Sequence, residues 1–93
     1  MIRSFKCAET KAIFERIGSK KFRGIEKAAY GRLLRLDAAT GLSDLAMVRG
    51  NRLEQLAGDR KGQHSIRVND QYRLCFVWTE KGPADVELVD YHA

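Results

Sequence analysis

The stretch Ser65-Ile66-Arg67-Val68-Asn69-Asp70-Gln71-Tyr72-Arg73-Leu74-Cys75-Phe76-Val77-Trp78 alternates apolar with polar side chains on both sides of Asn69-Asp70-Gln71. Such alternation predicts two strands, and the polar residues between them predict a hairpin turn. Opposite residues of a hairpin share a face, so the loop length sets the register. A two-residue loop would set Ile66 opposite Arg73, whereas a three-residue loop sets Ile66 opposite Leu74. We predict the three-residue loop, because it gathers the apolar side chains on one face.

This register also assigns the polar side chains of the hairpin to the two faces. Arg67 and Arg73 lie opposite one another on the second face, where two positive charges repel unless an anion joins them. Cys75 shares that face, but a lone cysteine without a paired base is more often a packing residue than a nucleophile. His64 falls beside Phe76 on the apolar face, where a histidine more often packs than catalyses. We therefore leave Cys75 and His64 out of the candidate site.

Two helices are predicted before the hairpin. Apolar residues at helical spacing, ending at Gly18, predict a first helix over about residues 8–17. A second stripe, with apolar residues recurring every three or four positions, predicts a helix over about residues 25–38. The apolar pair in residues 2–5 predicts a short strand before the first helix.

Further strands are predicted around the hairpin. The segment 40–51 contains Gly41 and Gly50 and is predicted to be a loop, followed by a strand at 53–56. A turn bounded by glycines at 58–62 leads into the hairpin. Alternation from Val86 to Val89 predicts a last strand, which pairs with the strand beginning at Tyr72.

These elements indicate one α+β domain spanning residues 1–93, with two N-terminal helices packed on a twisted, mainly antiparallel β-sheet. A chain of 93 residues is long enough for one modest hydrophobic core. Its 44% hydrophobic residues and single proline are typical of a folded domain, and no linker or repeat divides it.

The charge balance favours an anionic partner. The chain has 17 Lys and Arg residues against 12 Asp and Glu residues, and its isoelectric point is about 9.5. A basic surface attracts nucleic acid non-specifically, although a charge surplus is commonly only a solvated surface. Arg60 and Lys61, in the turn before the hairpin, are candidates for phosphate binding together with Arg67 and Arg73.

No metal or cofactor is expected. The two cysteines, Cys7 and Cys75, lack the short paired spacing of a zinc site, and the two histidines, His64 and His92, do not complete one. Residues 1–6 lack the apolar stretch of a signal peptide, and the longest apolar run is too short for a bilayer. We expect a cytoplasmic protein with reduced thiols and no membrane association.

The C-terminal residues Asp90-Tyr91-His92 place three side chains that can handle protons or bind phosphate in a row. Histidine titrates near neutrality and can protonate a leaving alkoxide. Consecutive strand residues project to opposite faces, so the three can serve one site only if the chain frays or turns at Tyr91. The alternative interpretation is a polar, frayed tail, because chain termini commonly tolerate change.

The chain as a whole resembles HigB-type toxins of the RelE/ParE superfamily, from bacterial type II toxin-antitoxin pairs. The resemblance covers nearly all 93 residues. The segments that carry it are Ile2-Arg3-Ser4-Phe5-Lys6, Leu33 to Ala39, Gly58-Asp59-Arg60-Lys61-Gly62, Ser65-Ile66-Arg67-Val68, Tyr72-Arg73-Leu74 and Asp90-Tyr91-His92.

This resemblance implies a ribosome-dependent endoribonuclease that cleaves messenger RNA in the decoding site. It also implies a small helix-turn-helix antitoxin, HigA-like, as the partner that silences the toxin. By position, Asp90, Tyr91 and His92 match the catalytic C-terminus of the family, and Arg73 matches a strand arginine facing the same site. His92 would then be the general acid, Tyr91 would stack on a base or bind the phosphate, and Asp90 would orient the tail or the imidazole.

The chain departs from the family at the predicted strand 53–56. The best-known HigB enzymes have Leu-His-Pro-Leu-Lys there, and this chain has Leu53-Glu54-Gln55-Leu56-Ala57. A histidine and a lysine are therefore missing. Glu54 is the candidate replacement as general base, because a carboxylate near cations can accept the 2′-hydroxyl proton. Glu54 is otherwise a surface residue on an exposed strand.

Two other functions stay open. The ParE branch of the superfamily shares the fold, lacks the terminal catalytic set and poisons DNA gyrase by binding it. Asp90-Tyr91-His92 disfavours that function, whereas the missing histidine and lysine favour it. A plain RNA-binding module, in which Arg67, Arg73 and Tyr91 hold nucleic acid without cutting it, is the third possibility.

Overall fold

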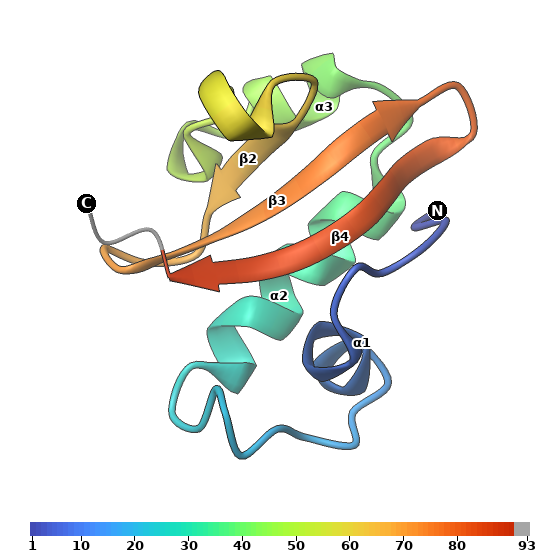
Figure 1. Cartoon of the computed structure of the whole chain (residues 1–93). Coiled ribbons are helices and arrows are strands. Elements are labelled where there is room, and N and C mark those ends of the chain that lie inside the picture. Colours follow the sequence, from blue (N-terminus) through green and yellow to red (C-terminus); the bar gives the residue numbers. More distant parts are fainter. Residues whose placement is uncertain (91–93) are drawn as a thin grey trace.

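The structure, a computed structural model of the 93-residue chain, describes residues 1–90. It has a layer of helices on one face of an antiparallel sheet (Figure 1), which confirms the predicted α+β fold. The sheet order is β1-β2-β3-β4. The main elements are α1 (Ala8–Phe14), α2 (Glu26–Ala38), β1 (Glu54–Gln55), β2 (His64–Arg67), β3 (Tyr72–Thr79) and β4 (Gly82–Asp90).

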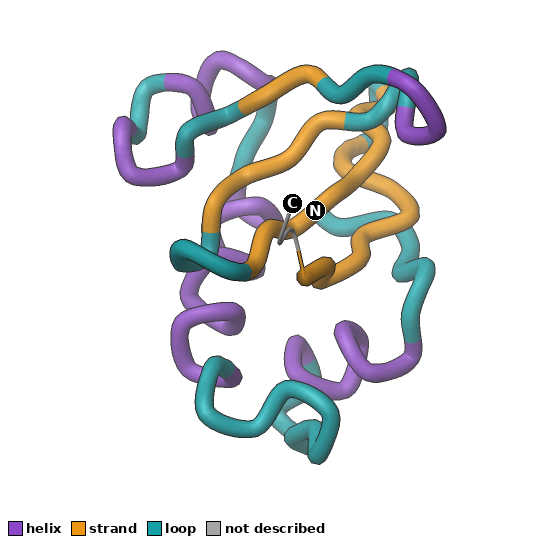
Figure 2. The backbone as a smooth tube through the Cα atoms, turned by 60° about the vertical axis from the view of Figure 1, so that its left-hand side comes forward, coloured by secondary structure: helices purple, strands orange, loops and turns teal. Residues whose placement is uncertain are grey.

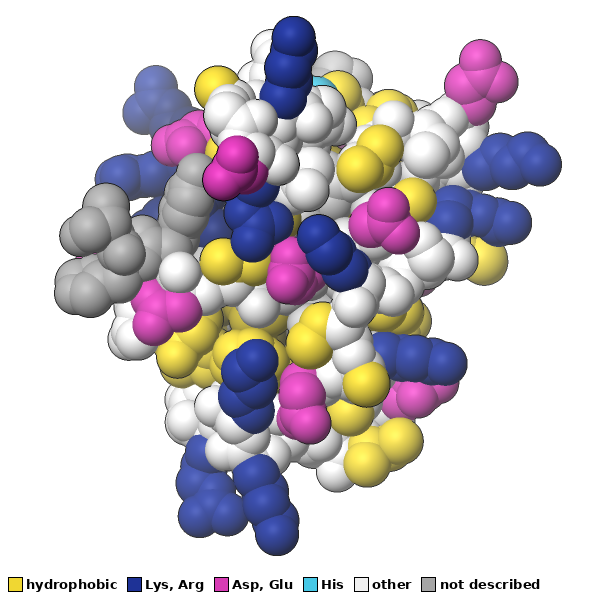
Figure 3. Space-filling model, in the orientation of Figure 1, with side chains coloured by type: hydrophobic (Ala, Val, Ile, Leu, Met, Phe, Trp, Pro, Cys, Tyr) yellow, Lys and Arg dark blue, Asp and Glu magenta, His cyan; other side chains and the backbone are white. Residues whose placement is uncertain are grey.

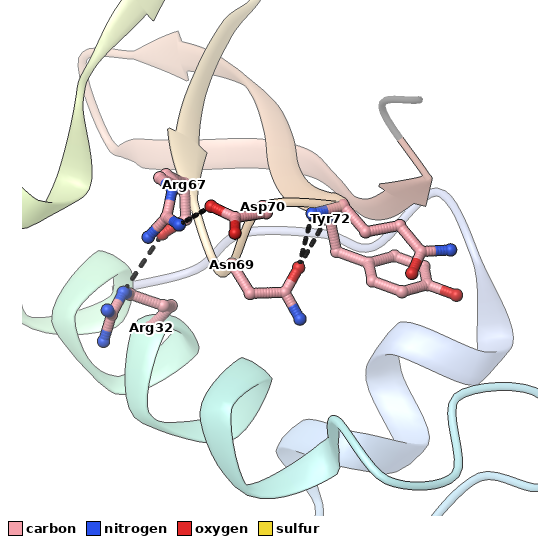
Figure 4. A network of polar contacts seen from close by, with 6 residues as sticks. Arg32, Arg67, Asn69, Asp70 and Tyr72 are labelled. Carbon is pink, nitrogen blue, oxygen red and sulfur yellow. Dashed lines mark hydrogen bonds and ion pairs between the residues drawn. The ribbon is translucent and has the colours of Figure 1, made fainter. Parts of the chain in front are cut away.

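The β2–β3 hairpin has the predicted register. Ile66 pairs with Leu74, and Arg67 pairs with Arg73. The three-residue loop is fixed by Asn69, whose Oδ1 accepts hydrogen bonds from the backbone N–H groups of Gln71 and Tyr72, at 2.8 Å and 2.7 Å (Figure 4). An asparagine side chain that satisfies the backbone two and three residues later is a common way of making a tight turn. The loop chemistry and the hydrophobic pattern thus specify the same register.

The hydrophobic core lies between the sheet and the two long helices. The helices contribute Ile13 from α1 and a buried stripe on α2, and the predicted apolar face of the hairpin lies against them. Figure 2 shows the two layers from the side, with α1 and α2 on one side of the strands. The buried members of this core from α2 and the strands are Ala29, Leu33, Leu36, Ile66, Leu74, Phe76, Val86 and Leu88.

The first helix is shorter than predicted. It ends at Phe14 rather than Ile17, because Arg16 adopts a left-handed conformation with φ of 64°. The N–H of Arg16 donates to the Ile13 carbonyl and the N–H of Ile17 donates to the Ala12 carbonyl, which is the Schellman pattern of a helix C-terminus. The helical spacing of Ile17 was misleading, and its side chain is exposed.

The predicted loop at 40–51 is wrong, because it contains two short helical segments. Helix α3 (Leu42–Ala46) begins after Thr40, whose N–H and hydroxyl both donate to the Asp44 carboxylate at 2.8 Å. A 3₁₀ helix, η1 (Arg49–Asn51), follows. Buried Asn51 ties this region together, since its amide donates to the Leu45 carbonyl and accepts from Arg35 of α2.

The N-terminal segment is extended beside the sheet but does not form the predicted strand. Only Phe5 makes a bridge, parallel to Val86 of β4. The N–H of Arg3 donates to the Pro83 carbonyl at 2.7 Å, and the N–H of Ile2 donates to Asp37 of α2 at 2.8 Å. The segment therefore covers part of the β4 edge and links it to α2.

The other predicted strands are present with altered bounds. The segment 53–56 contributes β1, which pairs with Ser65 and His64 of β2. The glycine-bounded turn contains a 3₁₀ helix, η2 (Gly58–Arg60). The last strand pairs with β3 as predicted, with an irregularity between Cys75 and Val77. In both views of the backbone, α3 and η2 lie at the end of the molecule away from α1 (Figures 1 and 2).

Replacing Leu33 with Ala should lower the free energy of unfolding by about 2–5 kcal/mol, because the side chain is fully buried and the core cannot fill the cavity. The matched control is Leu34→Ala, since Leu34 is adjacent on the same helix but 45% exposed. That change should cost about 0.5 kcal/mol or less. Urea unfolding followed by circular dichroism measures both, and equal losses would contradict this description of the core.

Candidate functional site

The second face of the sheet carries a polar surface pocket of about 310 Å³. It lies where β1 begins, beside the hairpin loop. Its lining residues are Arg52, Glu54, Arg67, Asn69, Asp70 and Arg73. Three of the predicted site residues, Glu54, Arg67 and Arg73, are therefore brought together although 19 positions separate the first from the last.

Arg73 is held at the base of this pocket. Its side chain is only 10% exposed. Its Nε donates to the Ser65 hydroxyl at 2.7 Å, and its Nη2 donates to the backbone carbonyls of Arg52 and Ser65. A buried guanidinium needs such acceptors, because its desolvation is otherwise very costly. These bonds fix the orientation of the guanidinium.

Arg67, across from Arg73, is stabilised in a different way. Its guanidinium forms an ion pair with Asp70 in the hairpin loop, while its backbone carbonyl accepts a hydrogen bond of 3.1 Å from Arg32 of α2 (Figure 4). The Asp70 side chain is fully exposed, so this pair contributes little to stability. The two arginines thus coexist through separate contacts, and a shared anion is not needed to hold the fold.

The surroundings of the pocket stay electropositive. Burial, together with the positive charges of Arg35 and Arg67, lowers the pKa of Arg32. Within the pocket, the three arginines outnumber the two carboxylates, Glu54 and Asp70, by one charge. Lys and Arg side chains also project from many parts of the face seen in Figure 3, with Asp and Glu between them. An anion entering the pocket therefore meets a net positive charge.

Glu54 lies at the accessible rim of the pocket. It belongs to β1 and pairs with Ser65 of β2. One carboxylate oxygen is 4.0 Å from Nη1 of Arg73, and its side chain is 55% exposed. A carboxylate that is accessible and close to a fixed cation has the geometry for accepting a proton from a group bound by that cation.

Asp90 is on another part of the surface. It pairs with Tyr72 at the end of β4, and its Oδ2 accepts a hydrogen bond of 3.0 Å from Gln71. Because Arg73 is opposite Val89, Asp90 projects to the face of Tyr72. It lines a separate pocket of about 290 Å³ with Lys21, Phe22, Tyr72 and residues 87–89. Tyr91 and His92, also predicted to act in catalysis, lie outside the described residues.

Arg60 and Lys61 do not line the pocket of Arg73. The Arg60 guanidinium forms an ion pair of 3.2 Å with Glu87 and a hydrogen bond of 3.1 Å with Gln63. Lys61 follows η2 and is exposed to solvent. Any contact of these two residues with RNA would be made outside the pocket.

Sequence reasoning missed the groups that position Arg73. Ser65 could have been found, because the hairpin register places it on the arginine face beside Cys75. The Arg52 carbonyl carried no sequence signal, since it reaches Arg73 only through the left-handed backbone of Arg52, with φ of 43°. Asn69 and Asp70 were recognised only as loop residues, and both line the pocket.

The two residues left out of the site have packing roles. His64 stacks on Phe76, with ring centroids 6.3 Å apart, and Cys75 is buried. Within residues 1–90, no group of three or more His, Cys, Asp or Glu side chains is arranged to hold a metal ion. No helix of this described part is long and apolar enough to span a membrane.

Comparison with known proteins relates the chain to a family of bacterial toxins. A family model described as "RelE-like toxin of type II toxin-antitoxin system HigB" matches residues 4–92. The chain is also similar to "Toxin HigB-1" of Vibrio cholerae serotype O1, with 54% identity over 56 residues. That alignment covers 60% of this chain and 59% of the relative, so it spans about three-fifths of the relative's length.

Alkylation by iodoacetamide at pH 8 should modify Cys7 before Cys75. Burial raises the pKa of the Cys75 thiol and also shields it, whereas Cys7 is partly exposed. Because the pKa of the Cys75 thiol is higher in the folded state, the unfolded state loses this proton at a lower pH than the folded state does. The free energy of unfolding should therefore fall as the pH rises above about 8.5. Mass spectrometry of the protein and of Cys7→Ser measures the order, and rapid labelling of folded Cys7→Ser would contradict it.

Proposed function

Because the chain belongs to the HigB-like family of RelE-like toxins from type II toxin-antitoxin systems, we propose that it is a ribosome-dependent endoribonuclease that cleaves messenger RNA in the decoding site. The observation that carries this proposal is the pocket in which a fixed guanidinium, Arg73, lies beside an accessible carboxylate, Glu54. The proposed partners are the ribosome with its messenger RNA and a HigA-like helix-turn-helix antitoxin.

The chemistry requires three tasks from the protein. A ribose 2′-hydroxyl attacks the adjacent phosphorus, the bond to the leaving 5′-oxygen breaks, and extra negative charge develops on the phosphate oxygens. The protein must hold the phosphate, remove the proton of the 2′-hydroxyl and give a proton to the leaving oxygen. A guanidinium is permanently charged and can bind two phosphate oxygens at once.

We assign the first task to Arg73, assisted by Arg67. Arg73 is oriented by Ser65 and the Arg52 carbonyl before any ligand arrives. Donors that are already oriented need little reorganisation when the ligand binds. Arg67 can exchange its exposed partner Asp70 for a phosphate, because an exposed ion pair is weak.

We assign the proton transfers to Glu54 and His92. Glu54 would accept the 2′-hydroxyl proton, because its carboxylate is accessible and lies 4.0 Å from Arg73. His92 would protonate the leaving oxygen, Tyr91 would stack on a base or bind the phosphate, and Asp90 would orient the terminal residues. The roles of Asp90, Tyr91 and His92 rest on the match to the family's C-terminal pattern.

Primer extension on a defined messenger RNA tests this function. Wild-type protein should create new 5′ ends only when ribosomes are present. Glu54→Gln and His92→Ala should each lower the cleavage rate about 100-fold or more, because each removes a proton-transfer group. Glu80→Gln is the matched control, since it removes an exposed carboxylate in the turn between β3 and β4. In cells, His92→Ala should abolish growth arrest and still bind the antitoxin.

Intact messenger RNA in every reaction, from protein that still arrests growth, would contradict the nuclease. A gyrase supercoiling assay would then test the ParE-like function. Salt-sensitive binding of uncut RNA would support a binding module instead. Full cleavage by Glu54→Gln, with loss of cleavage in His92→Ala, would retain the nuclease and remove Glu54 from its mechanism.

A further inference from the structure

Arg52 occupies an unusual backbone position at the pocket. It follows η1 in a left-handed conformation, with φ of 43° and ψ of 57°. Residues with a Cβ atom rarely adopt this conformation, and in residues 1–90 five glycines take positive φ angles elsewhere. A strained backbone conformation persists when the surrounding contacts hold it, and such conformations are common at functional sites. At position 52 it brings the carbonyl to Arg73, in a residue that lines the pocket and is exposed to solvent.

The charge environment of Arg52 differs from that of the neighbouring arginines. Arg67 is paired with Asp70, and Arg60 outside the pocket is paired with Glu87. Within the described residues 1–90, the guanidinium of Arg52 has no ion pair and is exposed to solvent. In the pocket, Arg67 pairs with Asp70, and Arg73 lies 4.0 Å from Glu54. Arg52 therefore carries the positive charge by which the pocket exceeds its two carboxylates.

We propose that Arg52 binds a phosphate group of single-stranded RNA beside Arg73. The inference rests on the proposed nuclease function and adds a binding residue to it. A phosphodiester carries one negative charge, which matches the single excess charge of the pocket. As the 2′-hydroxyl attacks, the phosphate gains further negative charge, and a second guanidinium beside Arg73 would stabilise it.

The left-handed backbone at position 52 allows a variant that removes the side chain without disturbing the backbone. Arg52→Gly removes the guanidinium and keeps a residue suited to positive φ, so the backbone carbonyl that holds Arg73 should stay in place. Arg52→Lys keeps a positive charge. The matched control is Arg49→Ala, which removes an exposed arginine three positions earlier, outside the pocket.

The experiment measures binding of a single-stranded 2′-O-methyl RNA oligonucleotide, which cannot undergo 2′-hydroxyl attack, by fluorescence anisotropy at several salt concentrations. Arg52→Gly should weaken binding about tenfold, as expected for losing a charged hydrogen bond. It should also reduce the slope of log K against log salt by about 0.7, which corresponds to one phosphate contact. Arg52→Lys should retain the wild-type slope, and Arg49→Ala should retain both slope and affinity.

Equal behaviour of Arg52→Gly and Arg49→Ala would overturn the inference, because Arg52 would then contribute only general surface charge. Cleavage of ribosome-bound messenger RNA is measured with the same proteins. If wild type cuts RNA and Arg52→Gly binds and cuts as well as wild type, only the Arg52 inference fails. If wild type leaves messenger RNA intact, the proposed function fails, and the oligonucleotide slopes still decide whether Arg52 binds phosphate.

Discussion

The pairing of Ile66 with Leu74 across β2 and β3 determines which side chains lie on each face of the sheet. A shift of one residue would move the apolar side chains to the solvent face and Arg73 into the core. The Asn69 side chain prevents such a shift by fixing a three-residue loop. One face can therefore pack against α1 and α2, and the other can gather arginines around a polar pocket.

On that second face, the need to satisfy a buried guanidinium shapes the site. Ser65 and the Arg52 carbonyl both accept hydrogen bonds from Arg73, and the second of these requires a left-handed backbone after η1. The segment leading into β1 is thus tied to the sheet through the Arg73 side chain. Its attachment also places Glu54 beside Arg73, so the same contacts that hold the arginine bring the candidate base to it.

Sequence patterns correctly predicted the structural features that depend on local periodicity. The hairpin register, the second helix and the pairing of the last strand with β3 followed from alternation and helical spacing. The end of the first helix was missed because Arg16 takes a left-handed position usually filled by glycine. Helix α3 was missed because its five residues are too few to show a period. The contacts of Arg73 with residue 52 join distant parts of the chain, which no local pattern records.

In the proposed mechanism Arg73, oriented by its partners in the fold, binds the phosphate at which RNA is cut. The most direct measurement is the single-turnover cleavage rate of ribosome-bound messenger RNA by wild type and Ser65→Ala, with Ser43→Ala as the exposed control. Ser65→Ala leaves every proposed reacting group in place but releases Nε of Arg73. For Ser65→Ala alone, the rate should fall by about tenfold or more, equivalent to about 1.4 kcal/mol in the barrier. An unchanged rate in a folded Ser65→Ala protein would contradict this mechanism.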